Sequence, residues 1–299
     1  MSTLILINPH AAGGRARRLL LSLNEWLASI ELANKPDVVM SESLHEAHHE
    51  IGKRPLGSKI VVVGGDGTLN QMLPSLLSGK HVIGLVPYGS GNDCARAWGL
   101  HKLSWKEALA FALNGEASTI DLGRIQLNRR DLYYFHSSLA VGFDASVGNR
   151  ALAGPKFLSG LPRYLLATLR ELAHLKNWHL KVQTEGHVVQ EGDCLLASAL
   201  NTPTYGGGMP AVPHAMVNDG KLNLLVGGRF NRLQTLLMLP RLLIGKHLGH
   251  SRIQCVAFIE ATLSCPVAFP VAADGEALGL ATHLQINVLP DALHVVKKT

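Results

Sequence analysis

One segment of this sequence combines glycines, an acid and hydroxyl or amide side chains at close spacing: Gly64-Gly65-Asp66-Gly67-Thr68-Leu69-Asn70. It follows the apolar run Lys59–Val63 and precedes a predicted helix. Glycine lets the backbone approach a phosphate closely, and the first amides of a helix carry positive partial charge. Asp66 would repel a bare phosphate, so it indicates Mg²⁺ or a water on Mg²⁺. An ordinary strand-to-helix turn requires less than this, and the loop therefore predicts a phosphate site to which Thr68 and Asn70 add donors.

Two further loops end predicted strands in the same way. The strand 82–86 leads into Pro87-Tyr88-Gly89-Ser90-Gly91-Asn92-Asp93, and the strand Leu4–Ile7 leads into Asn8-Pro9-His10-Ala11-Ala12-Gly13-Gly14. Ser90 offers a hydroxyl, and Asn92 and Asp93 are also common helix N-caps. Because α/β sheets bind ligands at the carboxyl ends of their strands, the three loops together predict one nucleotide site.

Other phosphate and metal motifs fit less well. No G-x-x-x-x-G-K-[ST] occurs, G-x-G-x-x-G fails at its third glycine after Gly91, and no protein-kinase motif set is present. His45-Glu46-Ala47-His48-His49 satisfies H-E-x-x-H, which on a helix could bind zinc. The third ligand of the known zinc proteases is missing, so a zinc protease is disfavoured.

The elements that must position these loops alternate in the first part of the chain. Apolar strands are predicted at 4–7, 38–40, 59–63 and 82–86, and helices at 15–30, 43–51, 68–77 and 104–113. Strands buried on both faces and separated by helices predict a parallel α/β sheet. From residue 122 onward short strands and turns dominate, including 124–127 and 133–141, with one helical stretch at 156–176. We therefore predict an α/β domain, with a nucleotide-binding role, over 1–122 and a β-rich domain over 123–286; the tail at about 287–299 is a candidate to return to the first.

Composition restricts the partners. The 299-residue chain has a formal charge of +6, which favours anionic partners, but 5% aromatic content and the lack of a dense Lys/Arg block argue against nucleic acid. Four cysteines without a C-x-x-C pair and a start without a basic leader predict reduced thiols and a cytoplasmic location. Nothing in the sequence indicates an oligomeric state.

In their order along the chain, these loops resemble the diacylglycerol kinase catalytic domain family, which includes sphingosine kinases and soluble bacterial lipid kinases and is distantly related to NAD kinases. Further matching segments are Gly142-Phe143-Asp144-Ala145, Asn218-Asp219-Gly220 and Asp274-Gly275-Glu276. The resemblance covers nearly the whole chain. It implies a nucleotide-binding α/β domain, a β-sandwich-like second domain and ATP bound in the cleft between them.

The resemblance also assigns residue roles. ATP contacts would fall on Asn8, Ser41, Gly64–Asn70, Ser90, Asn92 and Asp93. Asp274 or Glu276 would act as general base beside the acceptor hydroxyl, with Asp66 also catalytic. The residues alone favour a hairpin turn at Asp274-Gly275, and the resemblance favours catalysis. A structural Mg²⁺ would bind Asp219 and the carbonyl oxygens of Met216 and Lys221, although Asn223 stands where relatives often have an acid.

Two leucine-rich stretches, 161–176 and 229–252, carry interspersed basic residues. They fit either core-facing helices with a solvated basic side or reversible docking on an anionic membrane at its inner face. We expect an ATP- and Mg²⁺-dependent kinase for a lipid hydroxyl. The alternatives are a NAD kinase-like enzyme and a nucleotide binder without turnover.

Overall fold

The computed structural model describes residues 2–32, 34–89, 91–155, 158 and 160–298. The chain divides into two units, each described here by itself. Unit 1 comprises Met1–Ile120 and Asp291–Thr299, and unit 2 comprises Asp121–Pro290. Two strands, β5 (Ser118–Leu127) and β13 (Glu276–Val295), contribute residues to both units.

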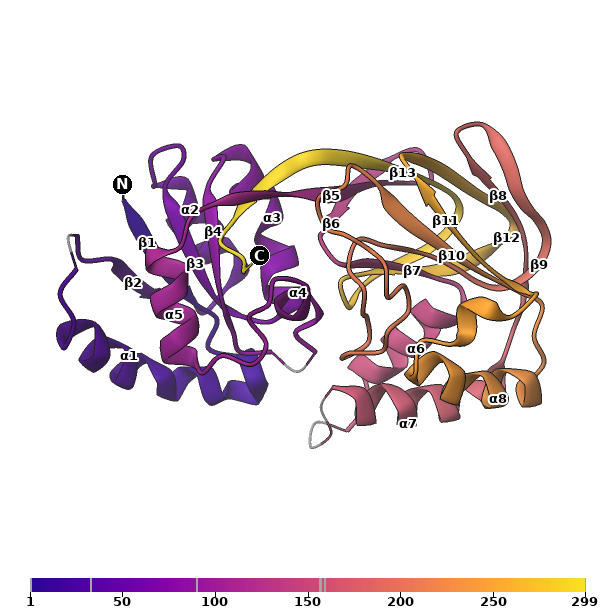
Figure 1. Cartoon of the computed structure of the whole chain (residues 1–299), viewed down its shortest axis with the longest axis horizontal. Helices are drawn as coiled ribbons and strands as arrows, with labels where there is room; N and C mark the ends of the chain where they lie inside the picture. Colours follow the sequence, from indigo (N-terminus) through magenta and orange to yellow (C-terminus); the bar gives the residue numbers. More distant parts are fainter. Residues whose placement is uncertain (1, 33, 90, 156–157, 159, 299) are drawn as a thin grey trace. The chain divides into compact units, whose positions relative to one another are not determined.

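Unit 1 is a parallel α/β structure (Figure 1). Its strands pair in the order β2-β1-β3-β4, all parallel, and the end of β13 adds to β4 in the same direction. The elements are β1 (Thr3–Ile7), η1 (Ala11–Arg18), α1 (Leu19–Ala28), β2 (Asp37–Met40), α2 (Leu44–Gly52), β3 (Lys59–Gly64), α3 (Asp66–Ser78), β4 (Val82–Pro87), α4 (Asp93–Ala97) and α5 (Trp105–Asn114).

Both faces of this sheet are buried. Ile5, Ile7, Val61 and Val63 pack with residues of α1 and α5 in one cluster. Their neighbours along β1 and β3 point to the opposite face and are equally buried. The continuous apolar runs in the sequence are explained by this two-sided burial.

The segment before α1 differs from the predicted helix 15–30. Residues Ala12, Gly13 and Gly14 have positive φ, so the chain passes through a kinked 3₁₀ segment and the regular helix begins only at Leu19. Positive φ is easy for the two glycines and places the Asn8–Gly14 loop in a tight turn at the end of β1.

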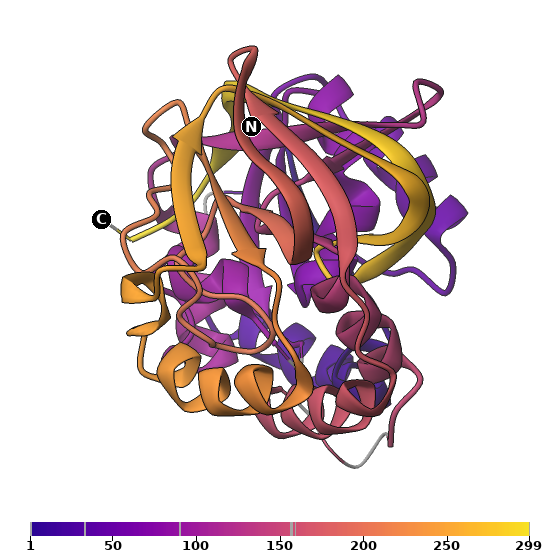
Figure 2. The same cartoon turned by 90° about the vertical axis from the view of Figure 1, so that its right-hand side faces the viewer.

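Unit 2 is β-rich, which together with unit 1 confirms the predicted fold class (Figure 2). Antiparallel pairing runs in the order β11-β10-β9-β7-β12-β13, β8 joins β9 to β12, and β5 pairs with β6. The elements other than β5 and β13 are β6 (Asp131–Phe135), β7 (Ser138–Val141), α6 (Phe143–Leu152), α7 (Leu161–Glu171), η2 (Leu172–His174), β8 (Trp178–Thr184), β9 (His187–Leu200), β10 (Leu222–Gly228), α8 (Arg232–Leu243), η3 (His247–Gly249), β11 (Ile253–Phe258) and β12 (Glu260–Ala273).

Among the residues that the structure describes, three α-helices interrupt the strands of unit 2. Helix α7 lies in the predicted stretch 156–176, and α8 lies in the leucine-rich stretch 229–252, for which a core-facing helix was one of the two interpretations; α6 has no counterpart among the predicted elements. Helix α8 contains Pro240, yet its start is well defined by a capping box between Asn231 and Gln234. Both views show α7 and α8 on the same side of the strands of unit 2 (Figures 1 and 2).

The predicted strand 133–141 is divided into β6 and β7 at His136 and Ser137. The backbone amides of these two residues donate to the side chain of Asp274 instead of to a neighbouring strand. Among the helices that the structure describes, none has both the length and the apolar character needed to cross a bilayer.

Candidate functional site

Three loops of unit 1 are tied together at the carboxyl ends of β1, β3 and β4. Asn8 Nδ2 donates to Thr68 Oγ1 at 2.8 Å, which joins the first loop to the Gly64–Asn70 loop. The Tyr88 amide donates to the Gly64 carbonyl at 2.8 Å, which joins the third. The sequence predicts that these loops lie together, and the hydrogen bonds show which residues of the loops contact one another.

Asp66 has a structural task in addition to any chemical one. Its two carboxylate oxygens accept from the backbone amides of Asp93 and Cys94, at 2.9 and 3.1 Å. These amides are the first of α4, where a negative charge is stabilised by the helix dipole. Asp66 therefore caps the helix that follows the third loop, and this role is not apparent from the spacing of the sequence.

Gly65 and Gly89 let two loops approach backbone to backbone. A Cβ added to Gly65 would lie 2.8 Å from Gly89 Cα, and one added to Gly89 would lie 2.5 Å from Gly65 Cα. Real Cβ atoms do not come this close, so any larger residue would separate the loops. At these two positions the glycines are explained by loop packing, without reference to a phosphate.

The remaining predicted nucleotide residues of unit 1 differ in what they can offer. Asn92 has φ of 55° and holds the Gly89 backbone through both its amide atoms, so it does not cap α4. Asp93 is buried and lies 3.8 Å from Arg96. The side chain of Leu69 is fully buried, which leaves only its backbone for a ligand. Ser90 lies outside the described residues.

Ser41 and Asn70 complete the predicted set. Ser41 follows β2, is nearly buried, and donates its amide to the Ile7 carbonyl, so it lies beside the start of the Asn8 loop. Asn70, in the first turns of α3, is partly exposed. Ser41 therefore lies next to the Asn8 loop, and Asn70 is the last residue of the Gly64–Asn70 loop.

The two predicted acids of unit 2 have different surroundings. Asp274 lies at the turn between β12 and β13, and its side chain is fully buried. Its carboxylate accepts from the amides of His136, Ser137 and Ser138 at 2.8–2.9 Å, and His136 Nε2 lies 3.3 Å away. The turn has φ of 47° at Asp274 and 88° at Gly275, as a tight hairpin requires.

Glu276, by contrast, begins β13 and is partly exposed. It lies one residue beyond the turn that Asp274 fixes. The side chain of Glu276 can therefore meet a substrate, whereas that of Asp274 holds the turn in place.

The predicted metal turn is exposed. Asp219 Oδ1 accepts from the Lys221 amide at 3.1 Å, and the Gly220 amide donates to Asp121 Oδ2 at 2.7 Å. Asp121 is buried and was not among the predicted site residues; its position at the start of unit 2 gave no signal. The other predicted ligands are the carbonyl oxygens of Met216 and Lys221, and oxygen is the ligand type that Mg²⁺ prefers.

The zinc motif does not assemble. His45 and His49 are exposed on α2, and Glu46 accepts from the Glu42 amide at the helix start. Within the ranges that the structure describes, no three His, Cys, Asp or Glu side chains gather closely enough to hold a metal ion.

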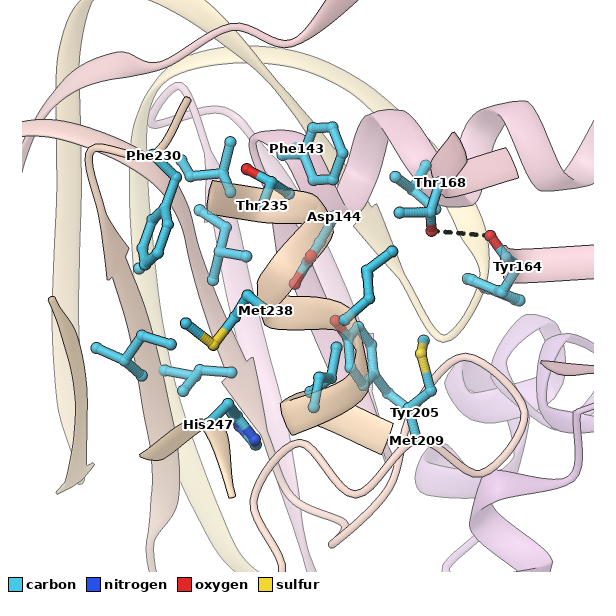
Figure 3. Close-up of a pocket in the computed structure, with 18 residues that line it drawn as sticks. Phe143, Asp144, Tyr164, Thr168, Tyr205, Met209, Phe230, Thr235, Met238 and His247 are labelled. Carbon is cyan, nitrogen blue, oxygen red and sulfur yellow. Dashed lines mark hydrogen bonds between the residues drawn. The ribbon is translucent and has the colours of Figure 1, made fainter. Parts of the chain in front are cut away.

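An apolar cavity lies inside unit 2, between the strands and helices α6, α7 and α8 (Figure 3). Its volume is about 80 Å³, and part of it is open to solvent. The lining residues are Phe143, Asp144, Val147, Tyr164, Thr168, Leu195, Leu196, Tyr205, Met209, Leu225, Gly227, Phe230, Thr235, Met238, Leu239, Leu242, His247 and Ile253. Its lining of mainly hydrophobic side chains with a few polar groups is typical of a small-molecule pocket.

Asp144 is the only carboxylate among these lining residues, and its side chain points into the cavity (Figure 3). Ser198 Oγ donates to its Oδ2 at 3.0 Å, and the Tyr205 hydroxyl also bonds to it. Burial raises the pKa of Asp144 from 3.8 to about 6, against the opposing effect of these two bonds. The sequence marks Asp144 only as part of a motif and does not indicate that it enters a cavity.

Comparisons with known proteins match two parts of the chain to two family models. Residues 2–125 match the diacylglycerol kinase catalytic domain, and residues 137–297 match the YegS C-terminal NAD kinase beta sandwich-like domain. A diacylglycerol kinase of Mycobacterium tuberculosis is 30% identical over 87% of this chain and 84% of its own length. A diacylglycerol kinase of Bacillus subtilis is 26% identical over 79% of this chain and 77% of its own.

A solved structure shows the same fold. The crystal structure of a diacylglycerol kinase from Bacillus anthracis superposes with a TM-score of 0.70, at 17% identity, over 99% of this chain and 97% of that one. At this identity the likeness concerns the fold alone. The match extends through both units, so no large part of the fold is peculiar to this chain.

Proposed function

This chain belongs to the diacylglycerol kinase catalytic domain family and is a kinase of the lipid kinase type, and we propose that it transfers the γ-phosphate of ATP to the hydroxyl of a lipid. The proposal of a lipid acceptor rests on the apolar cavity of unit 2. A cavity lined mainly by Leu, Met, Phe and Val side chains suits an acyl chain and offers few partners to a polar dinucleotide such as NAD.

The loops of unit 1 supply the donor side of the reaction. Amides at the start of α3 and the side chains of Asn8 and Thr68 are suited to phosphate oxygens. Asp66 supplies a carboxylate, the ligand type that Mg²⁺ or its water prefers. Magnesium, when bound, would offset the charge of the transferred phosphate. The bonds between the loops keep these groups in place before ATP binds.

On the acceptor side we assign the general base to Glu276 and a positioning role to Asp274. A base needs an accessible lone pair directed at the hydroxyl. Glu276 is partly exposed, whereas the buried Asp274 carboxylate already accepts three backbone amides. Asp274 fixes the turn from which Glu276 projects.

The outer face of α8 is suited to an anionic bilayer. Leu233, Leu236, Leu237 and Ile244 are exposed there, while Met238, Leu239 and Leu242 line the cavity. No acidic residue occurs from Leu222 to Ile259, and this stretch holds Arg229, Arg232, Arg241, Lys246 and Arg252. Exposed leucines among basic residues fit insertion into a negatively charged surface, from which a lipid could enter the cavity.

The kinase proposal is tested by supplying γ-labelled ATP and Mg²⁺ with diacylglycerol, phosphatidylglycerol, a sphingoid base or NAD. We expect label in a lipid and none in NAD. The variant Leu242→Trp, which fills the cavity, should lose lipid phosphorylation and keep ATP binding. Label in NAD would make the enzyme NAD kinase-like, and ATP binding without transfer to any acceptor would make it an idle nucleotide binder.

Membrane docking is tested by flotation with vesicles of phosphatidylcholine, with and without phosphatidylglycerol. Leu237→Glu should weaken binding to the anionic vesicles by about tenfold, because burial of one leucine is lost. Leu132→Glu is the matched control: Leu132 is 53% exposed, close to the 65% of Leu237, but lies on β6. An equal loss in both variants would refute a specific docking face.

A further inference from the structure

The surroundings of Asp144 are unusual for a buried carboxylate. Its partners, Ser198 and Tyr205, are hydroxyl donors, and no lysine or arginine is among the cavity residues. The other titratable groups that line the cavity are Tyr164, Tyr205 and His247. A carboxylate accepts about four hydrogen bonds, so two partners leave capacity for another donor.

The other polar groups of the cavity differ from Asp144 in the hydrogen bonds that they already make. The Thr168 hydroxyl donates to the Tyr164 carbonyl and the Thr235 hydroxyl to the Asn231 carbonyl, both within their own helices. His247 Nε2 lies 2.8 Å from the Ala211 carbonyl, to which it must donate, so its buried Nδ1 is a neutral acceptor without a partner among the described residues. Asp144 is the acidic acceptor among the lining residues, and a hydrogen bond to its carboxylate is stronger than one to the neutral Nδ1.

We propose that Asp144 determines acceptor specificity by accepting a hydrogen bond from a second donor on the lipid, a hydroxyl or amide N–H carried by the chain inside the cavity. This inference rests on the proposed function, because it takes the occupant to be the acceptor lipid. The preferred substrates are then lipids with a hydroxylated or amide-linked chain, and lipids with plain acyl chains are weaker ligands.

The position of the second donor follows from strand β7. At one end of β7, the Ser138 amide bonds to Asp274, next to the proposed base Glu276. At the other end, Val141 leads through Gly142 into α6 and Asp144. Three strand steps span on the order of 10 Å. The second donor, which bonds to Asp144, should thus lie on the order of 10 Å from the phosphorylated hydroxyl, on the chain and not on the glycerol.

The test compares 1-palmitoyl-2-stearoylglycerol with analogues that carry one hydroxyl on the stearoyl chain at carbon 3, 8 or 12. Binding is measured in detergent micelles by displacement of a fluorescent diacylglycerol, and phosphorylation is measured separately. For wild type, at least one analogue should bind about tenfold more tightly than the parent lipid, as expected for a hydrogen bond to a charged group.

Two controls link this preference to Asp144. In Asp144→Leu the ratio of affinities should fall to about one, because the acceptor is gone. In wild type the preference should weaken as the pH falls from 8 to 5, because the raised pKa of Asp144 lets it take up a proton in this range. The wild-type titration decides the matter even if the leucine variant does not fold.

The outcomes separate the two proposals. Equal binding of all four lipids to wild type, or a preference that persists in Asp144→Leu or is independent of pH, would overturn the role of Asp144. If the preference is present but no lipid is phosphorylated, the role of Asp144 in binding stands and the kinase proposal fails.

Discussion

Two buried or partly buried carboxylates, Asp66 in unit 1 and Asp144 in unit 2, are held in opposite ways. Asp66 accepts from two backbone amides at the start of α4. Asp144 accepts from two side-chain hydroxyls inside an apolar cavity. Backbone amides are fixed by the fold, whereas hydroxyls rotate and can exchange one partner for another.

This difference fits the two kinds of ligand. Phosphoryl transfer depends on positioning, so a carboxylate anchored by the chain suits the donor site. A lipid chain makes few directional contacts, so a carboxylate with spare lone pairs adds selectivity to a cavity that otherwise recognises only apolar surface. The folding free energy reflects the same contrast, because burial disfavours the charge of Asp144 while the amides stabilise that of Asp66.

The largest effect is expected from Asp66→Ala. Loss of the carboxylate should lower kcat by about a thousandfold, as for removal of an electrostatic group at the reacting phosphate. It should also destabilise unit 1 by about 1–2 kcal/mol, because α4 loses its cap. Steady-state kinetics and thermal unfolding measure the two effects. Asp66→Asn is the matched variant, since it keeps one acceptor oxygen for the cap without the charge. Full activity in either would remove Asp66 from the mechanism.

Asp144→Asn should change the pH dependence of stability, because it removes a buried carboxylate with a raised pKa. Since the folded pKa is about 6 and the ordinary value is 3.8, the folded state holds the proton more tightly. Wild type is therefore relatively most stable below pH 4 and loses stability as the pH rises to 6, by about 3 kcal/mol in all.

The measurement is the free energy of unfolding of both proteins from pH 4 to pH 8. The free energy of unfolding of Asp144→Asn, relative to that of wild type, should increase as the pH rises from 4 to 6. Asp131→Asn, at an exposed position, controls for the change in net charge. If the difference in unfolding free energy between the two proteins is the same at every pH, the pKa of Asp144 is not raised in the folded state.

Glu276→Gln should lower kcat by about a hundredfold and leave stability unchanged, as for loss of a general base. Asp274→Asn, its counterpart at the same turn, should cost about 1–3 kcal/mol of stability, because one of its oxygens no longer accepts from backbone amides. Kinetics with thermal melts of both variants separate the roles. The assignment is reversed if Asp274→Asn is as stable as wild type and inactive while Glu276→Gln is active.

Much of unit 1 could be predicted from sequence because its signals are local. Buried parallel strands read as continuous apolar runs, and each ends at a glycine-rich or polar loop such as Gly64–Asn70. What the sequence lacks is the side-chain pairing across distant loops. The bonds of Asp66 to Asp93 and Cys94 span more than 25 residues and depend on where α4 begins.

Unit 2 was harder to predict for a related reason. Helix α6 exposes little apolar periodicity, since small residues such as Ala145 and Gly148 face its buried side. Helix α8 has leucines on both its cavity face and its exposed face, so no single stripe identifies it. The cavity arises only when α6, α7 and α8 pack together, and the role of Asp144 depends on that packing.

The smallest effect tests whether the loops of unit 1 are tied by side chains as well as by backbone. Asn8→Ala and Thr68→Val each remove one partner of the 2.8 Å bond between Asn8 Nδ2 and Thr68 Oγ1. In a double-mutant cycle the coupling free energy should be about 1 kcal/mol, typical of a partly exposed hydrogen bond between neutral groups. The affinity for ATP should fall by a few-fold in each single variant, and no further in the double variant. Additive losses would mean that each side chain meets the nucleotide independently. The loops would then owe their arrangement to backbone bonds and to the close approach of Gly65 and Gly89 alone.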